Sequence, residues 1–205
     1  FLGELGAVDR ASYERENERF YEVYREGRLD IMAFLAFSLR PLSQYPREQL
    51  DAWHRRFMRE KIEPLITPAA QRLVERHRAC GDTLMIITAT NAFVTGPIAV
   101  RLDIPHLIAT EPETRGDRFT GRVAGIPSFR DGKVRRLESW LAENAATLDG
   151  SWFYSDSHND LPLLERVSHP VAVDPDPVLA EHARRRGWPL ISLRGNAQTS
   201  AHRHP

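Results

Sequence analysis

The strongest constraint on the fold is the alternation of short apolar runs with helical segments after Thr67. The run Thr83-Leu84-Met85-Ile86-Ile87 is continuous and apolar, which is typical of a buried parallel strand. Further short strands are expected at residues 106–109, 151–154, 170–173 and 190–192, and a hairpin around 119–123. Strands that alternate with helices favour a parallel, doubly wound sheet. We therefore predict an α/β core over residues 67–195.

Before Thr67 the pattern is helical throughout. Ser12 is a possible N-cap for a first helix, and Asp30 opens an apolar segment that we expect to close before Pro41. A third helix is expected from Pro46 on. We predict a small helical bundle over residues 1–66, separated from the core near Thr67, and a disordered tail over 196–205.

Composition sets broad limits on function. A chain of 205 residues with a formal net charge of zero has no general attraction to nucleic acid or to a membrane surface. The single Cys80 rules out a disulfide within the chain and fits a reducing compartment. There is neither a signal-peptide pattern nor an apolar run of membrane-spanning length. We expect a soluble, cytoplasmic protein without a nucleic-acid partner or a membrane span, and no oligomeric state follows from the sequence.

Two carboxylates and an amide follow the short strand at 151–154. They belong to the segment Tyr154-Ser155-Asp156-Ser157-His158-Asn159-Asp160. In open α/β sheets, ligands bind at the carboxyl ends of the strands, and oxygen ligands suit Mg²⁺. The alternative interpretation is a loop in which Asp160 caps the next helix, before Leu161-Pro162. This segment alone does not decide between the two.

Two further positions indicate an anion-binding site. Thr88 begins a small polar stretch that follows the first strand and precedes a helix, where hydroxyl and backbone N–H groups can bind an anion, although a plain capped turn has the same composition. Lys133 is one of only two lysines among 28 basic residues and lies at a helix start, where the helix dipole disfavours a cation. We predict that Thr88, Lys133, Asp156 and Asp160 form one pocket.

These residues carry a family resemblance. Ile86-Ile87-Thr88, Lys133 and the segment Tyr154 to Asp160 resemble the second, third and fourth motifs of the haloacid dehalogenase (HAD) superfamily. The helical segment before Thr67 resembles the cap insert of its phosphoserine-phosphatase-like branch, subfamily IB. The resemblance extends to about Arg194 and implies a Rossmann-like, doubly wound parallel sheet with a helical-bundle cap.

The resemblance also implies roles for individual residues. Thr88, Ala89 and Asn159 would bind the phosphoryl group, and Lys133 would neutralise its negative charge. Asp156 would ligate Mg²⁺. Asp160 would hold Lys133 or a metal-bound water in place.

One motif of the superfamily is missing from the sequence. Its first motif, Asp-x-Asp followed by Thr, supplies the nucleophile and precedes the cap, and no such motif occurs here. Asp174-Pro175-Asp176 has the spacing but is better explained as the start of a helix. We expect a further segment before Phe1 that carries the nucleophile on a central strand, because buried unpaired N–H and C=O groups on its neighbours would cost about 1–3 kcal/mol each. The competing explanation is a pseudoenzyme.

The sequence thus predicts a Mg²⁺-dependent HAD-type phosphatase that hydrolyses a small phosphorylated metabolite through an aspartyl-phosphate intermediate. The cap has aromatic and arginine-rich faces, which would suit an amino-alcohol, sugar or lipid-headgroup phosphate. The alternative is a catalytically inactive module that binds phosphate for regulation. An unrelated nucleotide-binding domain is disfavoured, because neither the dinucleotide-binding glycine pattern nor the P-loop is present.

Overall fold

The computed structural model describes residues 1–194, so the tail predicted for 196–205 lies outside the described residues. The chain forms two compact units. The first comprises Phe1–Pro64 and Ile86–Phe129, and the second comprises Leu65–Met85 and the described residues from Arg130 on. Each unit is described by itself below. The division at 66 between a cap and a core stays a prediction.

The N-terminal helices of the first unit are α1 (Arg10–Arg25), α2 (Ile31–Gln44) and α3 (Arg47–Phe57), followed by a π-helical turn at Met58–Ile62 and a 3-10 turn at Glu63–Leu65. Asp30 caps α2 as expected. The cap of α1 is Asp9 and not Ser12, because the Asp9 carboxylate accepts the N–H of Ser12. Pro41 does not end α2 but lies inside it. The turn after Pro41 places Leu42 in the core, which offsets the missing hydrogen bond.

The first unit also contains a three-stranded sheet in the order β1-β2-β3. Its strands are β1 (Met85–Asn91), β2 (His106–Arg115) and β3 (Arg118–Ala124), and α5 (Ala92–Arg101) follows β1. β2 and β3 form the predicted antiparallel hairpin, and α2 packs on β3. The buried core joins these elements through Leu35, Leu39, Leu42, Leu50 and Phe119.

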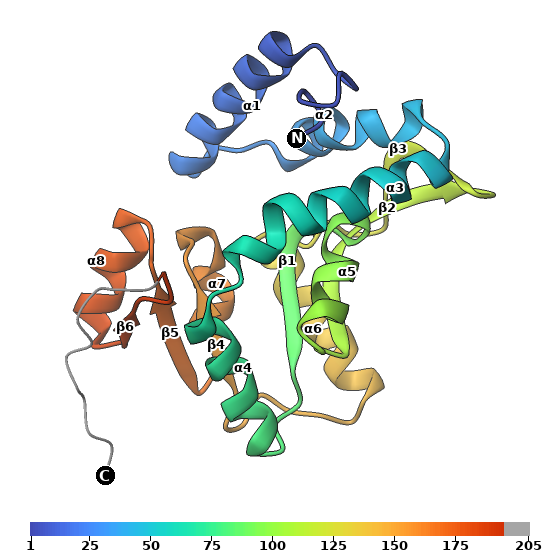
Figure 1. The fold of residues 1–205 in the computed structure, drawn as a ribbon. Coiled ribbons are helices and arrows are strands. Elements are labelled where there is room, and N and C mark those ends of the chain that lie inside the picture. Colours follow the sequence, from blue (N-terminus) through green and yellow to red (C-terminus); the bar gives the residue numbers. More distant parts are fainter. Residues whose placement is uncertain (195–205) are drawn as a thin grey trace. The chain divides into compact units, whose positions relative to one another are not determined.

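The second unit is built around the parallel sheet β4-β5-β6. Its strands are β4 (Trp152–Ser155), β5 (His169–Val173) and β6 (Leu190–Ile191). Its helices are α4 (Pro68–Ala79), α6 (Asp131–Glu143), the 3-10 turn η3 (His158–Asp160), α7 (Leu161–Leu164) and α8 (Pro177–Arg186). Figure 1 shows α8 beside β5 and β6, where Leu179 and Ala183 pack on Ala172 and Leu164.

The predicted α/β class is confirmed, with one difference in the sheet. The described strands form two three-stranded sheets and not one, with β1 at the end of the first and β4 at the end of the second. The sequence also placed the end of the first strand at Ile87, whereas β1 continues to Asn91. Asn91 then caps α5 directly, since its side chain accepts the N–H of Val94. No separate turn is needed between strand and helix.

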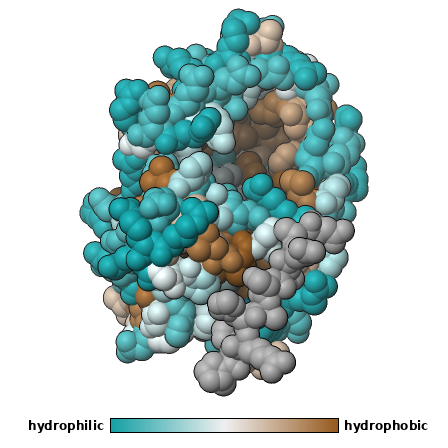
Figure 2. All heavy atoms as spheres, turned by 90° about the vertical axis from the view of Figure 1, so that its left-hand side faces the viewer, coloured by the Kyte–Doolittle hydropathy of each residue, from teal (hydrophilic) through white to brown (hydrophobic). Residues whose placement is uncertain are grey.

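The surface reflects the high content of charged residues. On the face drawn in Figure 2, hydrophilic side chains cover most of the surface and hydrophobic ones gather in patches. Within the described residues, every helix is too short or too polar to cross a bilayer.

One buried titratable side chain in the first unit yields a pH-dependent prediction. The Nε2 of His54 lies 3.0 Å from the carbonyl oxygen of Val94, so this nitrogen carries the proton and donates it. Burial lowers the pKa of His54 below its ordinary value of 6.5, and the Val94 carbonyl only partly opposes this effect. The folded state therefore binds a proton at His54 less readily than the unfolded chain does.

We expect this difference to make the free energy of unfolding depend on pH. The stability is fully present above pH 6.5, where both states are neutral, and is lost as the pH falls from 6.5 toward the lower pKa of the folded state. In His54→Gln, whose side-chain amide can still donate to Val94, urea titrations from pH 7.5 to pH 5 should show a smaller loss than in the parent. If the free energy of unfolding falls equally in the two proteins between pH 7.5 and pH 5, His54 does not cause the pH dependence.

Candidate active site

The centre of the site is a buried ion pair between Lys133 and Asp160. Lys133 lies in the first turn of α6 and is 6% exposed, and Asp160 ends η3 and is 7% exposed. The Lys133 Nζ donates to Oδ1 of Asp160 at 2.5 Å. The other oxygen, Oδ2, accepts the Ser155 hydroxyl at 2.7 Å. A buried charge needs such partners, because an isolated one costs several kcal/mol.

This arrangement decides between the two interpretations of Asp160. Asp160 occupies the N-cap position of α7, but its side chain makes no capping hydrogen bond there. Both carboxylate oxygens are instead used by Lys133 and Ser155. The carboxylate therefore serves the lysine and not the helix.

Two serines organise the turn between β4 and α7. The Ser155 hydroxyl accepts the N–H of Ser157 at 3.1 Å, and the Ser157 hydroxyl accepts the N–H of Asn159 at 3.2 Å. Asn159 is 3% exposed. The chain of bonds runs from the end of β4 to Asp160, so the sequence Ser-Asp-Ser-His-Asn-Asp folds into a turn whose shape is fixed by its own side chains.

Asp156 is the exposed member of this turn. Among the described residues its carboxylate has neither a hydrogen-bonding nor an ion-pair partner, whereas its carbonyl oxygen accepts the N–H of Asp176 at 2.8 Å. A free carboxylate at a strand end fits Mg²⁺, which binds through one or two carboxylates and keeps several waters. Within residues 1–194, no three His, Cys, Asp or Glu side chains gather closely enough to hold a metal ion. Asp156 would therefore need water or further protein oxygens as co-ligands.

Asp176 links this turn to the start of α8. Its Oδ1 caps α8 by accepting the N–H of Leu179, as its place in the sequence predicted. Its Oδ2 accepts the backbone N–H of His158 at 2.7 Å and lies 2.8 Å from the ring Nδ1 of that residue. Burial raises the pKa of Asp176, but these hydrogen bonds outweigh burial and lower the pKa below its usual range.

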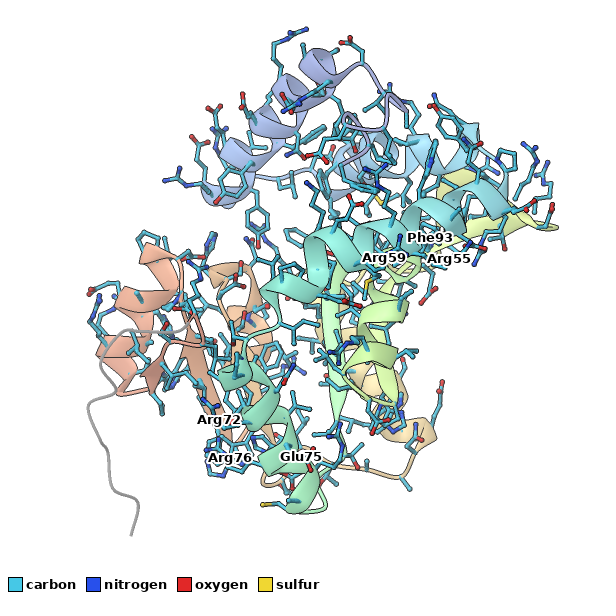
Figure 3. The ribbon with its side chains drawn as sticks, viewed as in Figure 1. Arg55, Arg59, Arg72, Glu75, Arg76 and Phe93 are labelled. Carbon is cyan, nitrogen blue, oxygen red and sulfur yellow. The ribbon has the colours of Figure 1, made fainter. Side chains whose placement is uncertain are left out.

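The strand that carries the turn is also held from α4. The Tyr154 hydroxyl lies 2.7 Å from Nε2 of His77, and Nδ1 of His77 lies 2.6 Å from the Asp82 carboxylate. Burial raises the pKa of Tyr154 above its ordinary value of 10, although the guanidinium of Arg76 opposes the shift. Figure 3 shows Arg76 on α4 together with Arg72 and Glu75.

Of the predicted site residues, Lys133, Asp156, Asn159 and Asp160 lie in the second unit, at or near the carboxyl end of β4. Thr88 and Ala89 lie on β1 in the first unit. The Thr88 oxygen accepts the N–H of Thr90 at 3.2 Å, which leaves its hydroxyl hydrogen available for another acceptor. That Thr88 and Ala89 share a pocket with Lys133 stays a prediction.

The sequence reasoning missed Arg130. This residue precedes α6, and its Nε donates to Oδ1 of Asn159 at 2.8 Å. It also missed that Ser155, Ser157 and Asp176 hold the turn together. Asp176 had been singled out only as a helix cap, and nothing in its spacing reveals the bond to His158.

The site thus combines a lysine held by a carboxylate with a free carboxylate just after a parallel strand. Comparison with known proteins identifies the family. The model of the haloacid dehalogenase-like hydrolase family matches residues 2–165, so the chain belongs to this family. The predicted superfamily is thus confirmed. Relatives named histidinol-phosphatase and phosphoserine phosphatase support the predicted phosphoserine-phosphatase-like branch and confirm the class of enzyme, a HAD-type phosphatase.

Individual relatives agree with this membership. The chain is 46% identical to a protein named histidinol-phosphatase from Neisseria meningitidis over 198 residues, which cover 95% of this chain and 89% of that protein. A Bordetella pertussis protein described as having unknown function is 46% identical, with a TM-score of 0.87 and coverage of 94% and 88%. A substrate-bound phosphoserine phosphatase shares the fold, with a TM-score of 0.68 at 18% identity and coverage of 92% and 84%. Further relatives are longer, and the chain spans 30–59% of their length.

Proposed function

We propose that this protein is a Mg²⁺-dependent phosphomonoesterase that acts on a small phosphorylated metabolite. The observation that carries the proposal is the buried Lys133–Asp160 pair together with the free carboxylate of Asp156 in the same turn as Asp160. A structural ion pair in this position would not need an unpartnered carboxylate four residues away. A phosphoryl site needs both a fixed positive charge and a carboxylate for the metal.

In the proposed reaction, an aspartate upstream of Phe1 attacks the phosphorus atom of the ester. The bond between phosphorus and the ester oxygen breaks, and the leaving alcohol takes up a proton. Water then attacks phosphorus in the aspartyl-phosphate, which releases inorganic phosphate and regenerates the carboxylate. We propose that this aspartate lies on a β-strand that precedes Phe1.

Each site residue of the described chain has one task in this reaction. The Lys133 ammonium neutralises charge on the transferring phosphoryl group, and Asp160 keeps it in position. The amide of Asn159 and the hydroxyl of Thr88 donate to phosphoryl oxygens. Asp156 would hold Mg²⁺, and a bound Mg²⁺ polarises the phosphoryl group.

For the substrate, the relative named histidinol-phosphatase supports an amino-alcohol phosphate. We propose histidinol phosphate as the first compound to test, with phosphoserine, a sugar phosphate and a lipid-headgroup phosphate as competitors. A cytoplasmic location agrees with the reducing compartment that the single Cys80 favours.

The test is a phosphate-release assay of the protein with its full N-terminus. We expect hydrolysis of at least one phosphomonoester in the presence of Mg²⁺, its loss on addition of EDTA, and no hydrolysis of a phosphodiester. If an amino-alcohol phosphate gives the highest kcat/KM, the substrate class is supported. If the folded full-length protein hydrolyses no phosphomonoester but binds phosphate, the protein is a phosphate-binding module and the proposal is wrong.

A further inference from the structure

The backbone of Arg130 has a conformation that L-residues rarely adopt. Its φ is 47° and its ψ is −122°, values close to the first central position of a type II′ turn, which favours glycine. Within residues 1–194, Asp103, Ala145 and Asp174 also have positive φ without being glycine. Asp103 and Ala145 follow the end of a helix, where such values are common, and Asp174 follows β5. Arg130 instead directly precedes α6. A side chain is kept here although glycine would fit the backbone better.

The side chain of Arg130 has a specific acceptor. Its Nε donates to Oδ1 of Asn159 at 2.8 Å. A guanidinium carries donors only, so it can pair with the oxygen of an amide but not with the nitrogen. The bond therefore fixes which way round the Asn159 amide lies, with the NH₂ group facing away from Arg130. One NH₂ hydrogen is donated to the Ser157 hydroxyl oxygen at 3.5 Å, and the other is available as a donor.

The start of α6 is bonded to η3 twice. Arg130 binds Asn159, and Lys133, three residues later, binds Asp160. Asn159 and Asp160 are consecutive and both are buried. The two cations thus hold two neighbouring side chains of the turn, one through its amide oxygen and one through its carboxylate.

We propose that Arg130 is a positioning residue for phosphoryl binding: it orients the Asn159 amide so that its NH₂ group donates to a phosphoryl oxygen. The inference rests on the proposed function. The unfavourable backbone is retained because a glycine at 130 would have no side chain to hold the amide. Arg130 acts through Asn159 and does not itself contact the substrate.

The experiment is a double-mutant cycle in the full-length protein, measured as kcat/KM for the best phosphomonoester. Arg130→Ala and Asn159→Ala should each lower kcat/KM by about 10–100-fold, as expected for a lost hydrogen bond to a charged group. The double variant should be no slower than the slower single variant. If the two losses multiply instead, Arg130 acts independently of Asn159 and the inference is wrong. An Arg130→Ala variant with unchanged kcat/KM would also overturn it.

Two further variants separate positioning from folding. Asn159→Asp keeps an oxygen for Arg130 but has no NH₂ group, so it should lose activity while its Tm stays within about 2 °C of the parent. Arg130→Gly should have a higher Tm than Arg130→Ala with the same low activity, because only the backbone conformation differs between them. If Asn159→Asp is as active as the parent, the NH₂ group is not needed and the proposal fails.

Matched controls lie on α6 and just beyond its end. Arg135 is exposed on α6, and Ala145 has a φ of 49° just beyond its end. Arg135→Ala and Ala145→Gly should leave kcat/KM unchanged, and Ala145→Gly should raise the Tm.

Failure of the inference and failure of the proposed function are distinguishable. If the parent is active and the two losses in kcat/KM multiply in the double variant, only the role of Arg130 is overturned. If the parent is folded but inactive, the proposed function is overturned and this inference with it.

Discussion

Lys133→Ala is expected to lower kcat/KM by at least about 100-fold and to destabilise the protein by about 3–5 kcal/mol. Both effects have the same origin. The ammonium that would stabilise the phosphoryl group also neutralises Asp160, which is 7% exposed and would be left as a buried unpaired charge. Phosphate release gives the first effect, and urea unfolding at pH 7.5 gives the second.

The chain supplies a matched control for this variant in its only other lysine. Lys61 pairs with Glu4 at 2.9 Å, but both side chains are about 40% exposed. Exposed pairs contribute about 1 kcal/mol or less, so Lys61→Ala should be nearly as stable as the parent and fully active. Similar losses of stability in the two variants would mean that the Lys133–Asp160 pair is not buried as described.

Asp156→Ala, unlike Lys133→Ala, should lower activity without lowering stability. Asp156 is exposed, so we expect its loss to change the free energy of unfolding by no more than about 0.5 kcal/mol. If its carboxylate holds Mg²⁺, kcat/KM should fall by about 100-fold or more, and the heat of Mg²⁺ binding in calorimetry should disappear.

The control for Asp156 is Asp117, which is also exposed and lies in the turn between β2 and β3. Asp117→Ala removes the same charge and should bind Mg²⁺ like the parent. Unchanged Mg²⁺ binding by Asp156→Ala would remove Asp156 from the metal site and would leave the carboxylate without an assigned role.

Much of the fold could be predicted from local patterns. The helix caps at Asp30 and Asp176 are visible in the sequence, because a short polar side chain before an apolar segment has few other uses. One error was local, since Asp9 and not Ser12 caps α1. Another came where tertiary packing outweighs local preference. Pro41 is tolerated inside α2 because the following turn buries Leu42, and no local pattern shows that contact.

The sequence allowed candidate site residues to be selected by type, but it did not give their geometry. The carboxylates of the turn and Lys133 could be selected because each is unusual where it stands. The sequence could not decide whether Asp160 caps a helix or binds a lysine, since the bond joins residues 27 apart. Arg130 gave no signal at all, because an unfavourable backbone conformation is a property of the folded chain and its side-chain partner is equally distant.

The most direct test of the central claim is a crystal structure of the full-length protein with Mg²⁺ and orthovanadate, a mimic of the transferring phosphoryl group. We predict that vanadate accepts hydrogen bonds from Lys133 Nζ, the Asn159 NH₂ group and the Thr88 hydroxyl, with Mg²⁺ on the Asp156 carboxylate. Vanadate bound elsewhere, or Mg²⁺ held without Asp156, would contradict the assignment of this turn as a phosphoryl-transfer site.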